Sequence, residues 1–162
     1  MPNDPITTGG LVAATLAVLF AILAAARRTR RGGKPAAERA AVLVAAGLCL
    51  ALIAWRALHG RIDWQPLDSH VDGLLLAGAL LALGAAHLQW TGVLKGADLF
   101  ALPALAVVLA WGVCASWWTF EPFDLRGAWN VIHVVSVYLG AVAIIGSATV
   151  GAMYLFIRRQ LR

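Results

Sequence analysis

The sequence predicts an all-α, polytopic transmembrane helix bundle of about five spans, forming one domain over residues 1–162. Three observations predict this fold. Apolar residues make up 61% of the chain and charged residues only 13%, whereas soluble domains contain about 45–50% and 25%. The mean hydropathy is +0.80. Finally, the apolar residues gather in five stretches, and a span needs about 20 such residues.

Breaks that contain charges, prolines and several tryptophans separate the five predicted spans. The first span is expected to be retained, because Arg27, Arg28, Arg30 and Arg31 follow it and no Lys or Arg precedes it. A signal peptide has the opposite polarity. The predicted spans are Gly9–Ala26, Ala40–Leu58, Val71–Leu88, Leu99–Trp117 and Trp129–Ile157.

Positive charges predict how the chain is oriented in the membrane. Lys and Arg are enriched in the cytoplasmic loops of membrane proteins. With the N-terminus outside, ten of the 13 Lys and Arg residues fall on the cytoplasmic side, and only Arg56, Arg61 and Arg126 fall outside. The sequence therefore predicts an external N-terminus and a cytoplasmic C-terminus. The charges lie beside the spans and set topology, so no nucleic-acid partner is expected.

Several kinds of chemistry lack their residues. Cys49 and Cys114 lie in apolar stretches, with no CxxC or CxxCH, and are expected to be buried thiols. The chain has no phosphate-binding loop, nucleophile elbow or dinucleotide fingerprint. The dispersed histidines do not form a zinc motif. A non-catalytic protein is expected.

Two spans carry histidines on faces that their spacing predicts to point into the bundle. Residues at steps of three or four share one helix face, and small residues there allow close packing. In the fifth span this face comprises Trp129, His133, Ser136, Gly140, Ala143, Ser147, Gly151 and Tyr154. In the third it comprises His70, Gly73, Ala77, Leu80, Gly84 and His87. His70 lies about 25 Å from His87 along the helix.

The orientation places His59, His70 and His133 at the outer side, together with Trp64, Trp117, Trp118 and Trp129. One interpretation is haem ligation by His133 with His70 or His59, in a pocket walled by indoles. Another is an interfacial Trp belt, with histidines hydrogen-bonded to water or to Asp68 or Asp72. Proton relays and metal ions stay open.

Short motifs around the fifth span resemble the cytochrome c assembly family, which includes CcsA and HemX-like proteins. The run Trp129-Asn130-Val131-Ile132-His133-Val134 is similar to the family's Trp and His-Val at an outer helix end, and it continues through Gly146-Ser147 to Met153-Tyr154-Leu155-Phe156. Pro66-Leu67-Asp68-Ser69 and Leu102-Pro103 also resemble family motifs. The likeness covers residues 40–162 and the front part of the family only, without its Trp-Asp-Pro run.

The resemblance implies haem handling on the outer face of a bacterial cytoplasmic (inner) membrane. His133 matches an axial ligand of the iron of haem b, Trp129 is a pocket wall, and His70 is a second ligand proposed from topology. The expected function is a subunit assisting haem delivery in cytochrome c maturation, surrounded by membrane lipid. A second membrane protein supplying the missing C-terminal half, or a second copy, is the expected partner. The alternatives are a cofactor-free assembly scaffold and a cytochrome b-like electron-transfer subunit using His70 and His87.

Overall fold

A computed structural model describes residues 4–31, 35–59, 69–92, 98–118 and 128–160, and these ranges contain helices and no strand. The prediction of an all-helical chain is confirmed for these ranges, and all five helices are long and apolar enough to cross a membrane. The helices are α1 (Pro5–Arg31), α2 (Ala36–His59), α3 (His70–Thr91), α4 (Asp98–Trp117) and α5 (Ala128–Gln160). Each helix extends beyond its predicted apolar stretch, by one residue in α4 and by several residues in the others.

Local sequence explains where α1 and α3 begin and where α3 ends. Asp4 caps α1 by accepting a hydrogen bond from the Ile6 N–H at 3.1 Å, and Pro5 follows in the first helical position, where a missing N–H costs nothing. Ser69 caps α3 by accepting from the Asp72 N–H. Gly92 ends α3 with a φ of 65°, a left-handed conformation that favours glycine.

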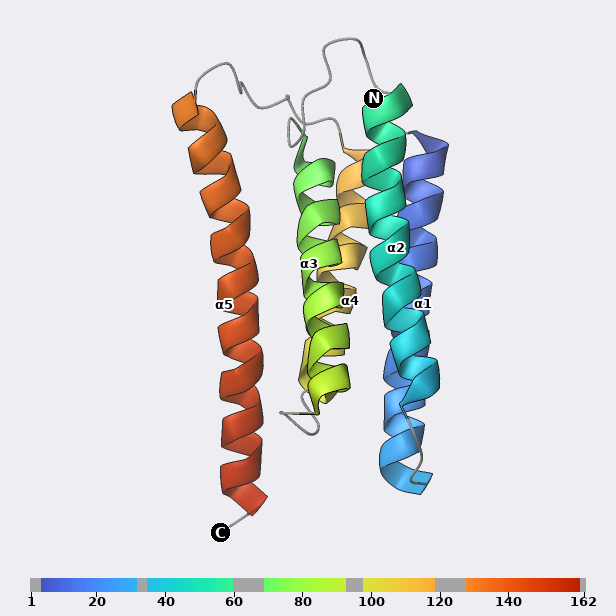
Figure 1. Cartoon of the computed structure of the whole chain (residues 1–162), viewed down its shortest axis with the longest axis vertical. Helices are drawn as coiled ribbons and strands as arrows, with labels where there is room; N and C mark the ends of the chain where they lie inside the picture. Colours follow the sequence, from blue (N-terminus) through green and yellow to red (C-terminus); the bar gives the residue numbers. More distant parts are fainter. Residues whose placement is uncertain (1–3, 32–34, 60–68, 93–97, 119–127, 161–162) are drawn as a thin grey trace.

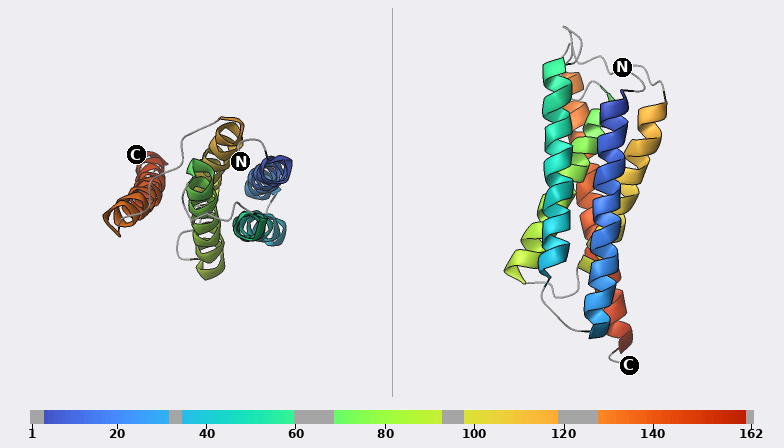
Figure 2. Two further views of the ribbon diagram at one scale, coloured as in Figure 1. Left: turned by 90° about the horizontal axis from the view of Figure 1, so that it is seen from above. Right: turned by 90° about the vertical axis from the view of Figure 1, so that its right-hand side faces the viewer.

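Helices α1 to α4 form an antiparallel core in which each packs against two of the others. Contacts join α1 to α2, α2 to α3, α3 to α4 and α4 back to α1. Figure 2 shows this arrangement from above, with α5 standing outside the core against α3 and α4. The two ends of the chain lie at opposite ends of the bundle (Figure 1). We call the end where α1 begins the amino-terminal rim, and the opposite end, which carries Arg27, Arg28, Arg30 and Arg39, the basic rim.

Small side chains let the four core helices approach closely. Alanines dominate the buried positions, together with leucines such as Leu11, Leu75 and Leu109. A Cβ atom on Gly78 would lie 2.8 Å from a methyl carbon of Leu109 and 3.5 Å from Cys49 Sγ, so a larger residue here would have to push the Leu109 side chain aside. Cys49 is buried as expected, but Cys114 is exposed. The prediction of two buried thiols is therefore wrong for Cys114, which lies on an outward side of α4.

Helix α5 is largely uncovered. Only 6% of its most apolar window is buried, compared with 28–50% for the other four helices. Large side chains such as Ile144, at 71% exposed, and Tyr154, at 63%, extend away from the core. The protein therefore consists of a four-helix core and a peripheral fifth helix, which leaves most of the α5 surface to lipid or to another membrane protein.

Candidate functional site at the amino-terminal rim

Three of the four histidines lie at the amino-terminal rim, as the spacing predicts. His59 is the last residue of α2, His70 is the first of α3, and His133 lies in the second turn of α5. His87 lies near the other end of α3. Trp129 is in the first turn of α5, and Trp117 ends α4 at the same rim. Trp64, Asp68 and the Pro66-Leu67-Asp68 part of the resemblance lie outside the described residues.

The predicted inward face of α5 is wrong. Trp129 is 79% exposed. Other exposed residues of this predicted face are His133, Ser136, Ala143, Ser147 and Gly151. Cβ atoms on Gly140, Gly146 and Gly151 would meet no heavy atom within 4 Å. The side of α5 that packs on the core is instead a stripe of larger residues at steps of three and four. It comprises Val134, Tyr138, Val142, Ile145, Thr149 and Met153.

The predicted inward face of α3 is correct only near the amino-terminal rim. Gly73 and Ala77 are buried, but Leu80, Gly84 and His87 are exposed. His70 is half-buried at the start of the helix. The side of α3 that faces the core drifts instead through Leu75, Ala79, Ala82 and Ala86. Towards the basic rim, the buried side of α3 therefore turns away from the predicted face. His70 is half-buried and His87 is exposed, so the two histidines do not share one buried face.

The remaining predicted ligand, His59, contacts Trp55 of its own helix. Its ring stacks on Trp55 with centroids 3.7 Å apart and an interplanar angle of 18°. Its Nδ1 lies 3.3 Å from the Trp55 carbonyl oxygen. The ring is exposed. Trp111 and Trp118 form an edge-to-face pair with centroids 5.7 Å apart, and both are more than half exposed. These exposed indoles are typical of an interfacial aromatic belt.

Tyr138 joins α5 to α3 about one turn below His70. Its ring lies directly against the backbone of Gly73, because a Cβ built on that glycine would overlap the ring carbons and the hydroxyl oxygen. One turn above Tyr138, Val134 is only 8% exposed. The upper part of α5 is therefore fixed by an aromatic side chain that packs on a glycine of α3.

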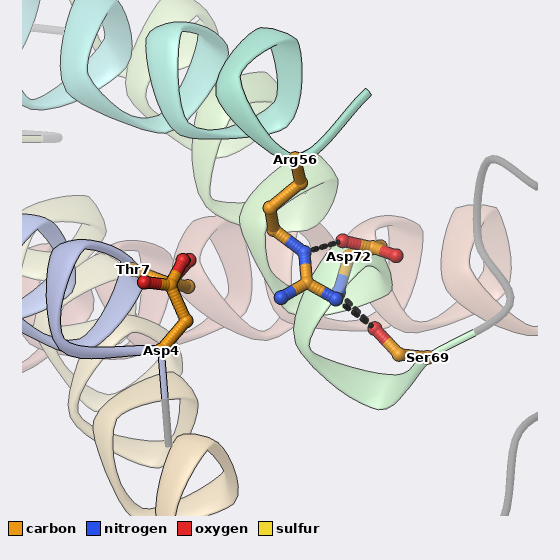
Figure 3. Close-up of polar contacts among 5 residues, drawn as sticks. All are labelled: Asp4, Thr7, Arg56, Ser69 and Asp72. Atoms are coloured by element: carbon orange, nitrogen blue, oxygen red, sulfur yellow. Dashed lines mark hydrogen bonds and ion pairs between the residues drawn. The ribbon is translucent and has the colours of Figure 1, made fainter. Parts of the chain in front are cut away.

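A buried ion pair links α2 to α3 beside this contact (Figure 3). Arg56 Nε pairs with Asp72 Oδ1, and the two side chains are 11% and 2% exposed. Arg56 Nη2 also donates to Ser69 Oγ at 3.0 Å. One guanidinium therefore holds both the cap and the third residue of α3. This pair was not predicted from the sequence, where Arg56 appeared only as an outer charge and Asp72 only as a hydrogen-bond partner for histidines. The spacing Ser69-x-x-Asp72 is that of a capping box and could have indicated the cap.

Asp4 brings α1 to the same cluster. Figure 3 shows Asp4 and Thr7 on the side of Arg56 away from Asp72. Partial burial alone raises the pKa of the Asp4 carboxyl. However, a 2.6 Å hydrogen bond from Thr7 Oγ1, backbone N–H donors and the charge of Arg56 outweigh this effect and hold the pKa below its ordinary value. Thr8 and Ser116, whose hydroxyls lie 3.0 Å apart, join α1 to α4. Polar contacts at this rim thus join α1 to α4 and α2 to α3, and the charge of Arg56 acts on Asp4 between the two pairs.

Half of a haem site would need one imidazole and an aromatic wall, and the rim has a candidate for each. Haem iron takes an axial imidazole nitrogen, and the porphyrin needs apolar or aromatic walls. His133 and Trp129 supply one imidazole and one indole, four residues apart on the exposed side of α5. His70 belongs to α3, against the opposite, packed side of α5. Among the described residues, no three His, Cys, Asp or Glu side chains gather as a metal ion would need.

No protein-family model, curated protein or solved structure matches this chain. The resemblance to the cytochrome c assembly family therefore depends on the short motifs around His133.

Proposed function

We propose that this protein is a non-catalytic membrane subunit that offers one side of a haem b site to a second membrane protein during cytochrome c maturation. The observation that carries the proposal is the exposure of His133 and Trp129 together on the uncovered side of α5. The amino-terminal rim is then extracytoplasmic and the basic rim cytoplasmic, in a bacterial inner membrane. This orientation follows the distribution of Lys and Arg residues.

The side of α5 that carries His133 is suited to contact with another helix. A lipid-exposed helix gains nothing from glycine, which costs about 1 kcal/mol relative to alanine, yet Gly140 and Gly151 lie on this side with open space over them. Small residues allow another helix to approach closely. A second protein seated here would cover the porphyrin and supply the other axial ligand. A second copy of the chain is the other candidate partner.

Haem is the group that would be delivered to a cytochrome, and the residues of this chain would position it. The imidazole of His133 would hold the iron from one side, and the indole of Trp129 would shield the porphyrin edge from water. The Tyr138–Gly73 contact and the Arg56–Asp72 pair hold α5 and α3 in place below. His70 is the candidate for a second contact at the same rim.

A cofactor-free assembly scaffold is the second candidate function. It is favoured by the stacking of His59 on Trp55 and by the separation of His70 from the exposed side of α5. In that case the same uncovered helix binds a partner without haem, and the tryptophans serve only as interfacial anchors.

An absorption spectrum distinguishes these two functions. Detergent-purified protein supplied with haem b is expected to show a Soret band, and His133→Ala is expected to weaken haem binding by about tenfold or more, because loss of the axial ligand costs at least about 1.4 kcal/mol. His87→Ala is the matched control, since His87 is an exposed histidine at the other rim. Equal bands for the wild type and His133→Ala would exclude haem ligation by His133. No band in either protein would exclude haem binding and leave the cofactor-free scaffold.

A further inference from the structure

The basic rim contains buried polar atoms that have no hydrogen-bond partner among the described residues. They include Nε of Arg39, on α2, and both amide atoms of Gln89, Nε2 and Oε1, on α3. The two side chains are neighbours, because Arg39 Nη2 donates to the Gln89 backbone carbonyl. Buried polar atoms are nearly always hydrogen-bonded, and leaving one without a partner costs free energy. This cluster therefore has the donors and the acceptor for a ligand.

The position of the cluster at a helix end favours contact with lipid headgroups. Gln89 is in the last turn of α3, which ends at Thr91 and is capped by Gly92. The next residue, Trp90, is 72% exposed, and exposed tryptophans at helix ends sit at the membrane–water interface. Gln89 and Arg39 are both only half-buried. These side chains are long, so a rotation about their outer torsion angles would be needed to bring the buried polar atoms to a headgroup at the bundle surface.

The charge of this rim favours an anion. The last two turns of α1 contain Arg27, Arg28 and Arg30, and α2 adds a fourth cation, Arg39. On the acidic side, Glu38 pairs with Arg28 Nε at 3.2 Å, and Asp98 begins α4. The cations therefore outnumber the carboxylates in α1 to α4 at this rim. Basic pockets between transmembrane helices are known to hold anionic lipid headgroups.

We propose that Arg39 and Gln89 bind the phosphate of an anionic phospholipid between α2 and α3. Arg39 Nε and Gln89 Nε2 donate to phosphate oxygens, and a charge-assisted hydrogen bond from arginine is the stronger of the two. Gln89 Oε1 accepts from a hydroxyl group of the headgroup. This combination of two donors and one acceptor fits a glycerol headgroup such as that of phosphatidylglycerol, and it does not depend on haem binding at the other rim.

Thermal unfolding of the full chain in detergent tests the site, with short-chain phosphatidylglycerol as the probe. The lipid is expected to raise the unfolding temperature of the wild type saturably, since a ligand that binds only the folded state stabilises it. Gln89→Leu and Arg39→Gln are each expected to raise the half-saturating concentration by about tenfold, from the loss of hydrogen bonds to a charged group. Gln89→Leu removes two buried atoms without partners, so it should still fold without lipid.

Controls separate a site from general charge attraction. Arg27→Gln removes an exposed arginine from the same rim, and its half-saturating concentration should equal that of the wild type. Short-chain phosphatidylcholine and inorganic phosphate at equal concentrations should have little effect. The proposal is overturned by an unchanged response in Gln89→Leu, by equal losses in Arg27→Gln and Arg39→Gln, or by an equal effect of either control ligand.

Discussion

Replacing Asp72 with alanine is expected to lower the free energy of unfolding by about 3–5 kcal/mol, because it leaves the buried charge of Arg56 without its counter-ion. The side chain of Asp72 is 2% exposed and that of Arg56 is 11% exposed, so water compensates little. Among the described residues, Arg56 would keep the Ser69 hydroxyl as a hydrogen-bond acceptor. Denaturant unfolding in mixed micelles measures the loss.

The double variant Arg56→Met with Asp72→Leu tests the physical reason. Replacing both partners of a buried ion pair with apolar side chains is often nearly neutral, so most of the stability should return. Arg27→Ala removes an exposed charge and is expected to stay within about 0.5 kcal/mol of the wild type. An Asp72→Ala variant as stable as the wild type would show that the ion pair does not hold α2 and α3 together.

A methyl group on Gly73 is expected to displace α5. Gly73→Ala places a carbon atom where the Tyr138 ring lies, and overpacking of this kind costs about 1–3 kcal/mol. Gly84→Ala, on the same helix with nothing within 4 Å of its new Cβ, is the matched control and should stabilise α3 by about 0.5–1 kcal/mol. The same unfolding assay measures both variants.

A double-mutant cycle assigns this cost to one contact. In a Tyr138→Ala background, Gly73→Ala should no longer destabilise the protein, because the ring that it displaces is gone. If Gly73→Ala costs the same with and without the ring, Tyr138 does not fix α5 on α3.

The sequence predicts the five helices well because a span must be long and continuously apolar, and these properties can be read without knowing the neighbours of a helix. Helix ends also follow local chemistry, as Asp4-Pro5 and Ser69-x-x-Asp72 show. The gathering of three histidines at one rim then follows from the alternating direction of the spans. Helix length and direction therefore need no tertiary information.

The rotation of α5 could not be predicted, because this helix is apolar on all sides. Its small residues indicated the packed side, but in the structure Val134 and Tyr138 pack on the core and Ser136 and Ser147 stay exposed. Small residues show where a helix can pack closely, and they do not show which partner it packs against. The Arg56–Asp72 pair was missed for a related reason: two charges 16 residues apart are brought together only by the packing of α2 on α3.

Cysteine labelling tests most directly whether His133 lies on the uncovered side of α5 and at its extracytoplasmic end. In a background lacking the exposed Cys114, His133→Cys and its neighbour Val134→Cys would be treated in intact cells with a membrane-impermeant maleimide. Cys at position 133 is expected to react and Cys at position 134 to stay protected, because Val134 is 8% exposed. Protection of position 133 with labelling of 134, or labelling of 133 only after the membrane is permeabilised, would contradict this placement.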